Sequence, residues 1–134
     1  MAGPVPGPTG SRAEMTRIAA SYAAGLEAGS FVASDTTFAP GAYRLESGAW
    51  MAGPGCVLGA LCADIRTGFL RPNPNLTYRV VGMDEELGIA WLALNFRSTG
   101  PGQSLFVWEM FKVYGGQIHA VEAFMKTMAT GPVW

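Results

Sequence analysis

The stretch "WEMFKVYGGQIHAVEAFMK", residues 108–126, decides the fold that this sequence predicts. Two segments rich in apolar and aromatic residues flank the pair Gly115-Gly116. A two-residue hairpin loop needs positive φ at both central positions, and glycine adopts that conformation without steric cost. The stretch therefore predicts two antiparallel strands joined by a tight turn.

Each predicted strand carries one glutamate in an otherwise apolar pattern. If Tyr114 faces Gln117 across the turn, a regular ladder places Glu109 directly opposite Glu122 on one face. Two adjacent carboxyl groups in apolar surroundings resist double ionisation, so one is expected to keep its proton above the usual carboxyl pKa. Three alternatives stay open: a solvent-facing pair, an ion pair with a distant cation, or a longer turn that puts the glutamates on opposite faces.

Both faces of this hairpin are largely apolar, which indicates a sheet that is covered on both sides. The domain's own helices would cover one face, and a second subunit would cover the other. The sequence thus predicts a homodimer through an outer sheet face that includes Trp108, Met110, Val121 and Met125.

The composition is that of one globular domain. The chain has 134 residues, of which 49% are hydrophobic and 14% charged, with a net charge of −1. This balance gives no reason to expect a nucleic acid or membrane partner, and no apolar run is long enough for a membrane helix. Cys56 and Cys62 form neither a disulfide framework nor a zinc motif, so they are expected to be free thiols in a cytoplasmic protein without a bound metal.

The order of the predicted elements is that of an α+β protein. Residues 1–12 lack the apolar segment of a signal peptide and are expected to be a disordered leader, and residues 13–134 to be a single domain. The periodicity predicts a helix over 13–28, a loop or short helix up to Pro40, a strand–turn–strand unit over 43–52, a second long helix over 55–70, and strands over 76–83, 88–98, 104–114 and 117–128.

This order resembles the nuclear-transport-factor-2-like superfamily, which includes ketosteroid isomerases, limonene epoxide hydrolase and SnoaL-type polyketide cyclases. The segment "FKVYGGQIHAVEAF" is the most typical part of the resemblance. The resemblance implies a cone-shaped, cystatin-like fold, in which helices pack on a curved antiparallel sheet that encloses a pocket.

Three separated segments are similar to ketosteroid isomerases. They are "SYAAGLEAGS" with Tyr22, "FAPGAYRLESG" with Glu46 and "WEMFKV" with Glu109. The resemblance implies that Glu46 moves a proton while Tyr22 and a protonated Glu109 stabilise an oxyanion. That family has aspartate where this chain has Glu46 and Glu109, and Glu122 has no counterpart there.

Limonene epoxide hydrolases carry a catalytic aspartate near the position of Lys126, so this lysine argues against their Asp-Arg-Asp chemistry. Lys126 is instead expected in or near the pocket, together with four further candidate lining residues, Trp50, Trp91, Asn95 and Phe124.

The resulting expectation is a cofactor-independent acid/base enzyme that acts on a small hydrophobic molecule, as an isomerase, cyclase or dehydratase. Glu46, Glu109, Tyr22 and Glu122 are the candidate catalytic residues. Two alternatives stay open: a non-catalytic ligand-binding or dimerisation module of the same fold, and an epoxide hydrolase or epoxide-opening cyclase.

Overall fold

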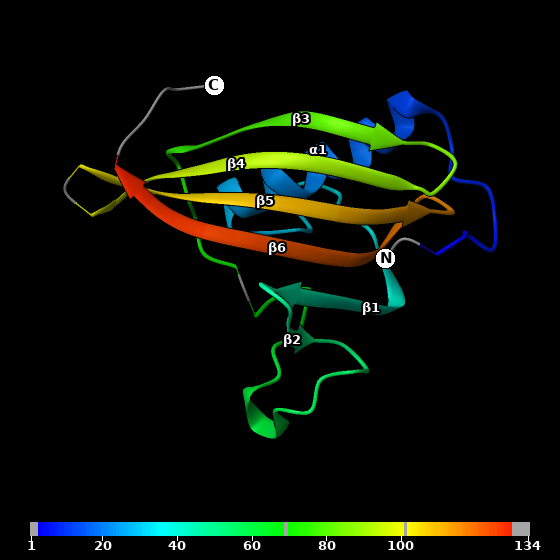
Figure 1. Cartoon of the computed structure of the whole chain (residues 1–134), viewed down its shortest axis with the longest axis horizontal. Coiled ribbons are helices and arrows are strands. Elements are labelled where there is room, and N and C mark those ends of the chain that lie inside the picture. The colour runs from blue at the N-terminus through cyan, green and yellow to red at the C-terminus, as the bar shows by residue number, and fades with distance from the viewer. Residues whose placement is uncertain (1–2, 69, 101, 130–134) are drawn as a thin grey trace.

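One helix, α1 (Arg12–Ala28), lies across one face of a curved six-stranded sheet (Figure 1). The computed structural model describes residues 3–68, 70–100 and 102–129. The strands follow the order β2-β1-β6-β5-β4-β3, and β1 and β6 pair in parallel while the other pairs are antiparallel. Their bounds are β1 Phe38–Glu46, β2 Ala49–Ala52, β3 Leu76–Asp84, β4 Ile89–Gly100, β5 Gln103–Tyr114 and β6 Gln117–Ala129. The predicted α+β class and its four C-terminal strands are confirmed.

The helix α1 begins and ends where its sequence predicts. The Ser11 hydroxyl accepts a hydrogen bond from the backbone N–H of Glu14, and Gly29 ends the helix with a φ of 75°. Its buried side is formed mainly by Met15, Ile18, Tyr22 and Leu26, which pack on what is here called the inner face of the sheet. The opposite side of the sheet is the outer face.

The β5–β6 hairpin has the predicted turn but not the predicted register. Tyr114 pairs with Gln117 around Gly115 and Gly116, whose φ values are 59° and 75°. Val113 pairs with Ile118, but Lys112 pairs with Ala120, so His119 is an extra residue in β6. Because strand side chains alternate, this bulge moves the rest of β6 by one position and exchanges its faces.

The prediction that the two glutamates oppose each other is therefore wrong. Glu109 faces Ala123, and Glu122 faces Met110. Glu109 lies in the inner face and is buried, whereas Glu122 lies on the outer face and is half-buried.

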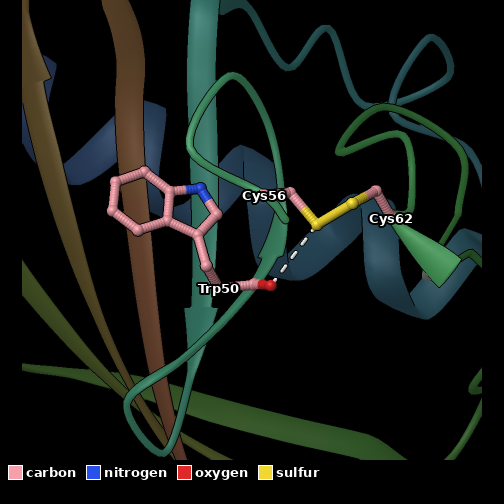
Figure 2. Close-up of a disulfide and its surroundings, with 3 residues drawn as sticks. All are labelled: Trp50, Cys56 and Cys62. Atoms are coloured by element: carbon pink, nitrogen blue, oxygen red, sulfur yellow. Dashed lines mark hydrogen bonds between the residues drawn. A yellow bond between two sulfur atoms is a disulfide. The ribbon is translucent and has the colours of Figure 1, made fainter. Parts of the chain in front are cut away.

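The predicted helix over residues 55–70 is also wrong. Within its described part only one 3₁₀ turn, η1 (Gly59–Leu61), is helical, and Cys56 and Cys62 form a disulfide (Figure 2). Residues six positions apart in an α-helix are separated by roughly 9 Å along the axis. Here the two Cα atoms are 6.0 Å apart, which a disulfide can span. The expectation of free thiols is corrected accordingly.

The segment between β2 and β3 projects from the sheet beside the edge strand β2 (Figure 1). The backbone N–H of Ala63 donates to the carbonyl of Met51, and Cys56 Sγ lies 3.5 Å from the carbonyl oxygen of Trp50. Several glycines interrupt the helical pattern, and Gly53 and Gly59 have φ values of 89° and 60°. The segment then returns to α1 and forms one side of the pocket described below.

Residues 3–10 lie against the β3–β4 and β5–β6 turns. Lys112 Nζ donates to the carbonyls of Gly3 and Leu87, both at 2.5 Å, and the Gly115 N–H donates to the Pro8 carbonyl at 2.9 Å. Residues 1–2 of the expected leader and residues 130–134 of the expected domain lie outside the described residues. Among the described residues, no helix is both long enough and apolar enough to cross a membrane.

Candidate active site

Arg44 is the centre of a buried polar cluster beneath α1. One terminal guanidinium nitrogen donates to the Tyr22 hydroxyl at 2.5 Å and to Glu109 Oε1 at 2.8 Å. Its Nε donates to Glu46 Oε1 at 2.9 Å. The guanidinium therefore links two carboxyl groups and a phenol, which come from two strands and the helix.

The strand register explains why these groups meet. Arg44 and Glu46 are two residues apart on β1, so both side chains point to the inner face. In the parallel β1–β6 pair Glu46 lies beside Ala123, and in the β5–β6 pair Glu109 lies on the other side of Ala123. The small side chain of Ala123 thus separates the two glutamates across one row of the sheet.

A pocket of about 410 Å³ opens beside this cluster. This volume is within the range of about 300–1,000 Å³ that is typical of small-molecule sites. The lining is apolar except at one end, where Arg44, Glu46 and Glu109 lie, and at its exposed side, where Arg71 and Asn73 lie. The other lining residues are Leu26, Gly68, Phe96, Leu105, Val107 and Met125.

Glu109 lines this pocket, and one of its carboxyl oxygens is buried without a hydrogen-bond partner among the described residues. The side chain is 1% exposed, and this oxygen is Oε2. Burial raises the pKa of the Glu109 carboxyl above its usual range, although the Arg44 guanidinium opposes the shift. A protonated Glu109 would accept from Arg44 at Oε1 and offer its proton at Oε2.

Of the other two buried groups, Tyr22 stays neutral and Arg44 stays positively charged. Burial raises the pKa of Tyr22, and the neighbouring Glu109 adds to the shift, so the phenol stays neutral. Burial alone would lower the pKa of Arg44, but Tyr22, Glu109 and Glu46 outweigh that effect and the pKa is raised. One guanidinium therefore faces two carboxyl groups and balances the charge of one of them.

Three of the four predicted catalytic residues come together. Tyr22, Glu46 and Glu109 all contact Arg44, whereas Glu122 lies on the outer face of the sheet. Tyr22 is buried behind Arg44 and does not line the pocket, so it can act on a bound molecule only through Arg44.

The five residues predicted to line the pocket do not line it. Phe124 and Lys126 lie on the outer face because of the bulge at His119. Trp91 and Asn95 also point outward, since Leu92, Leu94 and Phe96 supply the inner face of β4. Trp50 lies on the edge strand β2 and stacks on Tyr43, with ring centroids 4.7 Å apart.

Arg44 was not among the site residues predicted from the sequence. The signal for its role was its spacing: an arginine two residues before a candidate acid in a strand lies on the same face as that acid. Arg71 and the inner-face residues Phe96, Leu105, Val107 and Met125 were missed as well. Among the described residues, no group of three or more histidine, cysteine, aspartate or glutamate side chains could hold a metal ion.

The helix-backed curved sheet has the nuclear-transport-factor-2-like fold, which solved structures share. A nuclear-transport-factor-2-like protein of unknown function from Methylobacillus flagellatus KT superposes with a TM-score of 0.57 at 12% identity, covering 92% of this chain and 99% of its own. A second such protein, from Shewanella baltica OS155, gives a TM-score of 0.53 at 14% identity, covering 88% and 94%. A "putative ketosteroid isomerase" from Kribbella flavida gives 0.51 at 16% identity, covering 90% and 83%.

The particular family follows from the sequence itself. Residues 8–125 match the model of the family described as "Domain of unknown function (DUF8021)", and the chain belongs to that family. No curated protein matches the chain. At the identities above, the structural likeness establishes the fold alone, so the activity has to be argued from the pocket.

Proposed function

We propose that this protein is a cofactor-independent acid/base enzyme that acts on a small hydrophobic molecule, as an isomerase, cyclase or dehydratase. One observation carries the proposal: a buried carboxyl oxygen, Glu109 Oε2, has no hydrogen-bond partner among the described residues, and Glu109 lines an open pocket. Leaving such an atom unsatisfied costs about 1–3 kcal/mol. A bound substrate oxygen that accepts a proton or hydrogen bond there would remove this cost.

The geometry supports distinct roles for the two glutamates. Glu46 is partly exposed, lines the pocket and is held through one oxygen by Arg44 Nε, so we assign it the role of general base. The buried Glu109, with its raised pKa, is the acid that donates to the developing oxyanion. Arg44 holds both glutamates, and Tyr22 is a positioning residue that fixes Arg44.

Turnover on a panel of enones, epoxides and polyketide-like phenols tests this proposal. We expect Glu46→Gln and Glu109→Gln each to lower turnover by about 10²–10⁴-fold, the usual contribution of a positioned acid or base. Glu122→Gln is the matched control, because it changes a glutamate on the outer face. Unchanged turnover in both pocket variants would overturn the assignment.

Epoxide opening is the second candidate, and the Glu46–Arg44–Glu109 arrangement favours it. In such a set one carboxylate takes a proton from the attacking water, while the other group, as a protonated carboxylic acid, gives its proton to the epoxide oxygen. Lys126 no longer argues against this chemistry, because it lies on the outer face. Turnover of the epoxides in the panel distinguishes epoxide opening from the isomerase, cyclase and dehydratase reactions. Ligand binding without turnover of any substrate would indicate a non-catalytic binding module.

We further propose a homodimer through the outer face, and an oxidising compartment in place of the cytoplasmic location expected from the sequence. The outer face carries Trp91, Trp108 and Phe124, each between 44% and 49% exposed. The Cys56–Cys62 disulfide supports the second point, since disulfides persist mainly in oxidising environments.

A further inference from the structure

The charges that line the pocket do not balance when Glu109 is protonated. The lining contains two arginines, Arg44 and Arg71, and two glutamates, Glu46 and Glu109. Arg44 is bonded to both glutamates, and within the described residues no carboxylate forms an ion pair with Arg71. A neutral Glu109 therefore leaves one net positive charge in the lining, and Arg71, at the exposed side of the pocket, is the cation without a carboxylate partner among the described residues.

The backbone at Arg71 is fixed against the end of α1. The side-chain amide of Asn73 donates to the carbonyls of Arg71 at 2.6 Å and Leu26 at 2.9 Å. The backbone N–H of Asn73 donates to the Glu27 carbonyl at 2.9 Å. Pro72 packs so closely on Gly29 that a Cβ there would lie 2.8 Å from its nitrogen. This anchoring lowers the entropic cost of using Arg71 to bind a ligand.

We propose that the substrate is an apolar molecule bearing a carboxylate, and that Arg71 binds this carboxylate at the mouth of the pocket. The inference rests on the proposed function. The apolar body lies against Leu26, Phe96 and Val107, and the reacting end lies at Glu46 and Glu109. A guanidinium suits this task because its planar fork binds a carboxylate through two parallel hydrogen bonds.

The test compares binding of carboxylic acids with binding of their primary amides, which have the same shape without the charge. Isothermal titration with hydrocinnamate and cyclohexylacetate, each beside its amide, is carried out on the full chain. We expect the acids to bind the unmodified protein more tightly than the amides. Arg71→Gln should weaken acid binding by about 10–100-fold, as for a hydrogen-bonded charged pair, and leave the amides within about 2-fold.

Two further variants complete the experiment. Arg17→Gln, on the exposed side of α1, removes the same charge outside the pocket and should change neither affinity. Arg71→Lys should restore part of the acid affinity, because it keeps the charge but loses the fork. Equal weakening of acids and amides by Arg71→Gln, unchanged acid binding in that variant, or no acid binding at millimolar concentration would each overturn the inference.

The outcome is independent of turnover. Acid binding that depends on Arg71 in a protein that turns over no substrate would support the binding site and contradict the enzyme proposal. Turnover that is lost in Glu109→Gln, together with acid binding that is unchanged in Arg71→Gln, would support the enzyme and contradict the carboxylate site.

Discussion

At the scale of single residues, Arg44 determines what the two glutamates can do. It is buried and contacts Glu46, Glu109 and Tyr22. The sequence alone indicated Tyr22, Glu46 and Glu109, because each falls in a recognisable segment. It did not indicate that one guanidinium joins them, since that depends on the pairing of β1 with β6, which are far apart in the chain.

Replacing Arg44 by methionine should destabilise the protein by about 1–3 kcal/mol for each buried acceptor left without a donor, namely the Glu109 carboxyl group and the Tyr22 hydroxyl. Urea denaturation measures the change, and Arg17→Met serves as the control for losing an exposed arginine. In the Arg44→Met/Glu109→Gln double variant the loss should be smaller than in Arg44→Met alone. A loss below about 1 kcal/mol in the single variant would show that the cluster contributes little to stability.

The raised pKa of Glu109 predicts how stability changes with pH. Above the ordinary glutamate value of 4.5, the unfolded chain releases this proton while the folded protein keeps it. Stability from this group is therefore full below pH 4.5 and falls as pH rises through the folded-state pKa. Glu109→Gln should remove that part of the decline in denaturation curves recorded from pH 4 to pH 8. Identical pH dependence in the two proteins would contradict the shift.

At the scale of elements, the features that depend on a residue's own backbone conformation were predicted correctly, and those that depend on distant segments of the chain were not. Gly29 ends α1 and Gly115-Gly116 makes the turn, because each depends on the glycine's own φ. The bulge at His119 depends on the neighbouring strand β1. The N–H of Ile118 donates to the carbonyl of Thr37, which directly precedes β1, and the register of the β1–β6 pair also shifts in this region. No pattern within the hairpin marks that extra residue, and it alone decides which face Glu122 occupies.

The disulfide could not be predicted from the local pattern either. The apolar spacing of residues 55–70 is that of a helix, whereas the bond forms because the chain turns back between Cys56 and Cys62.

We expect a thiol reagent to find no reactive cysteine in the unreduced native protein. Reduction should lower the free energy of unfolding by at most about 2 kcal/mol, since the closed loop is short. The Cys56→Ser/Cys62→Ser double variant should be insensitive to reductant. Two reactive thiols in the untreated protein would show that the bond does not form.

At the scale of the whole molecule, the outer face of the sheet carries several exposed apolar side chains. Two of the four residues predicted for the interface do not lie on this face, because Val121 is buried in the core and Met125 lines the pocket. Trp108 and Met110 do lie on the outer face, where Trp91, Phe124 and Met128 join them. A contiguous apolar patch of this kind is typical of an interaction site.

We expect light scattering to show a dimer at micromolar concentration. Trp108→Glu and Phe124→Glu should each give a monomer, because each buries an unpaired charge at the centre of the interface. Val57→Glu is the control, since Val57 is an exposed apolar residue in the disulfide loop. A monomeric unmodified protein would contradict the dimer without affecting the pocket.

The central claim is that Glu109 is a protonated donor aimed at a ligand in the pocket. A carboxyl-carbon NMR titration, assigned with Glu109→Gln and repeated with a saturating phenol as an oxyanion mimic, tests it most directly. We predict that Glu109 titrates well above the ordinary glutamate value and that its resonance shifts when the phenol binds. A Glu109 that titrates at or below that value and does not respond to the phenol would contradict the account.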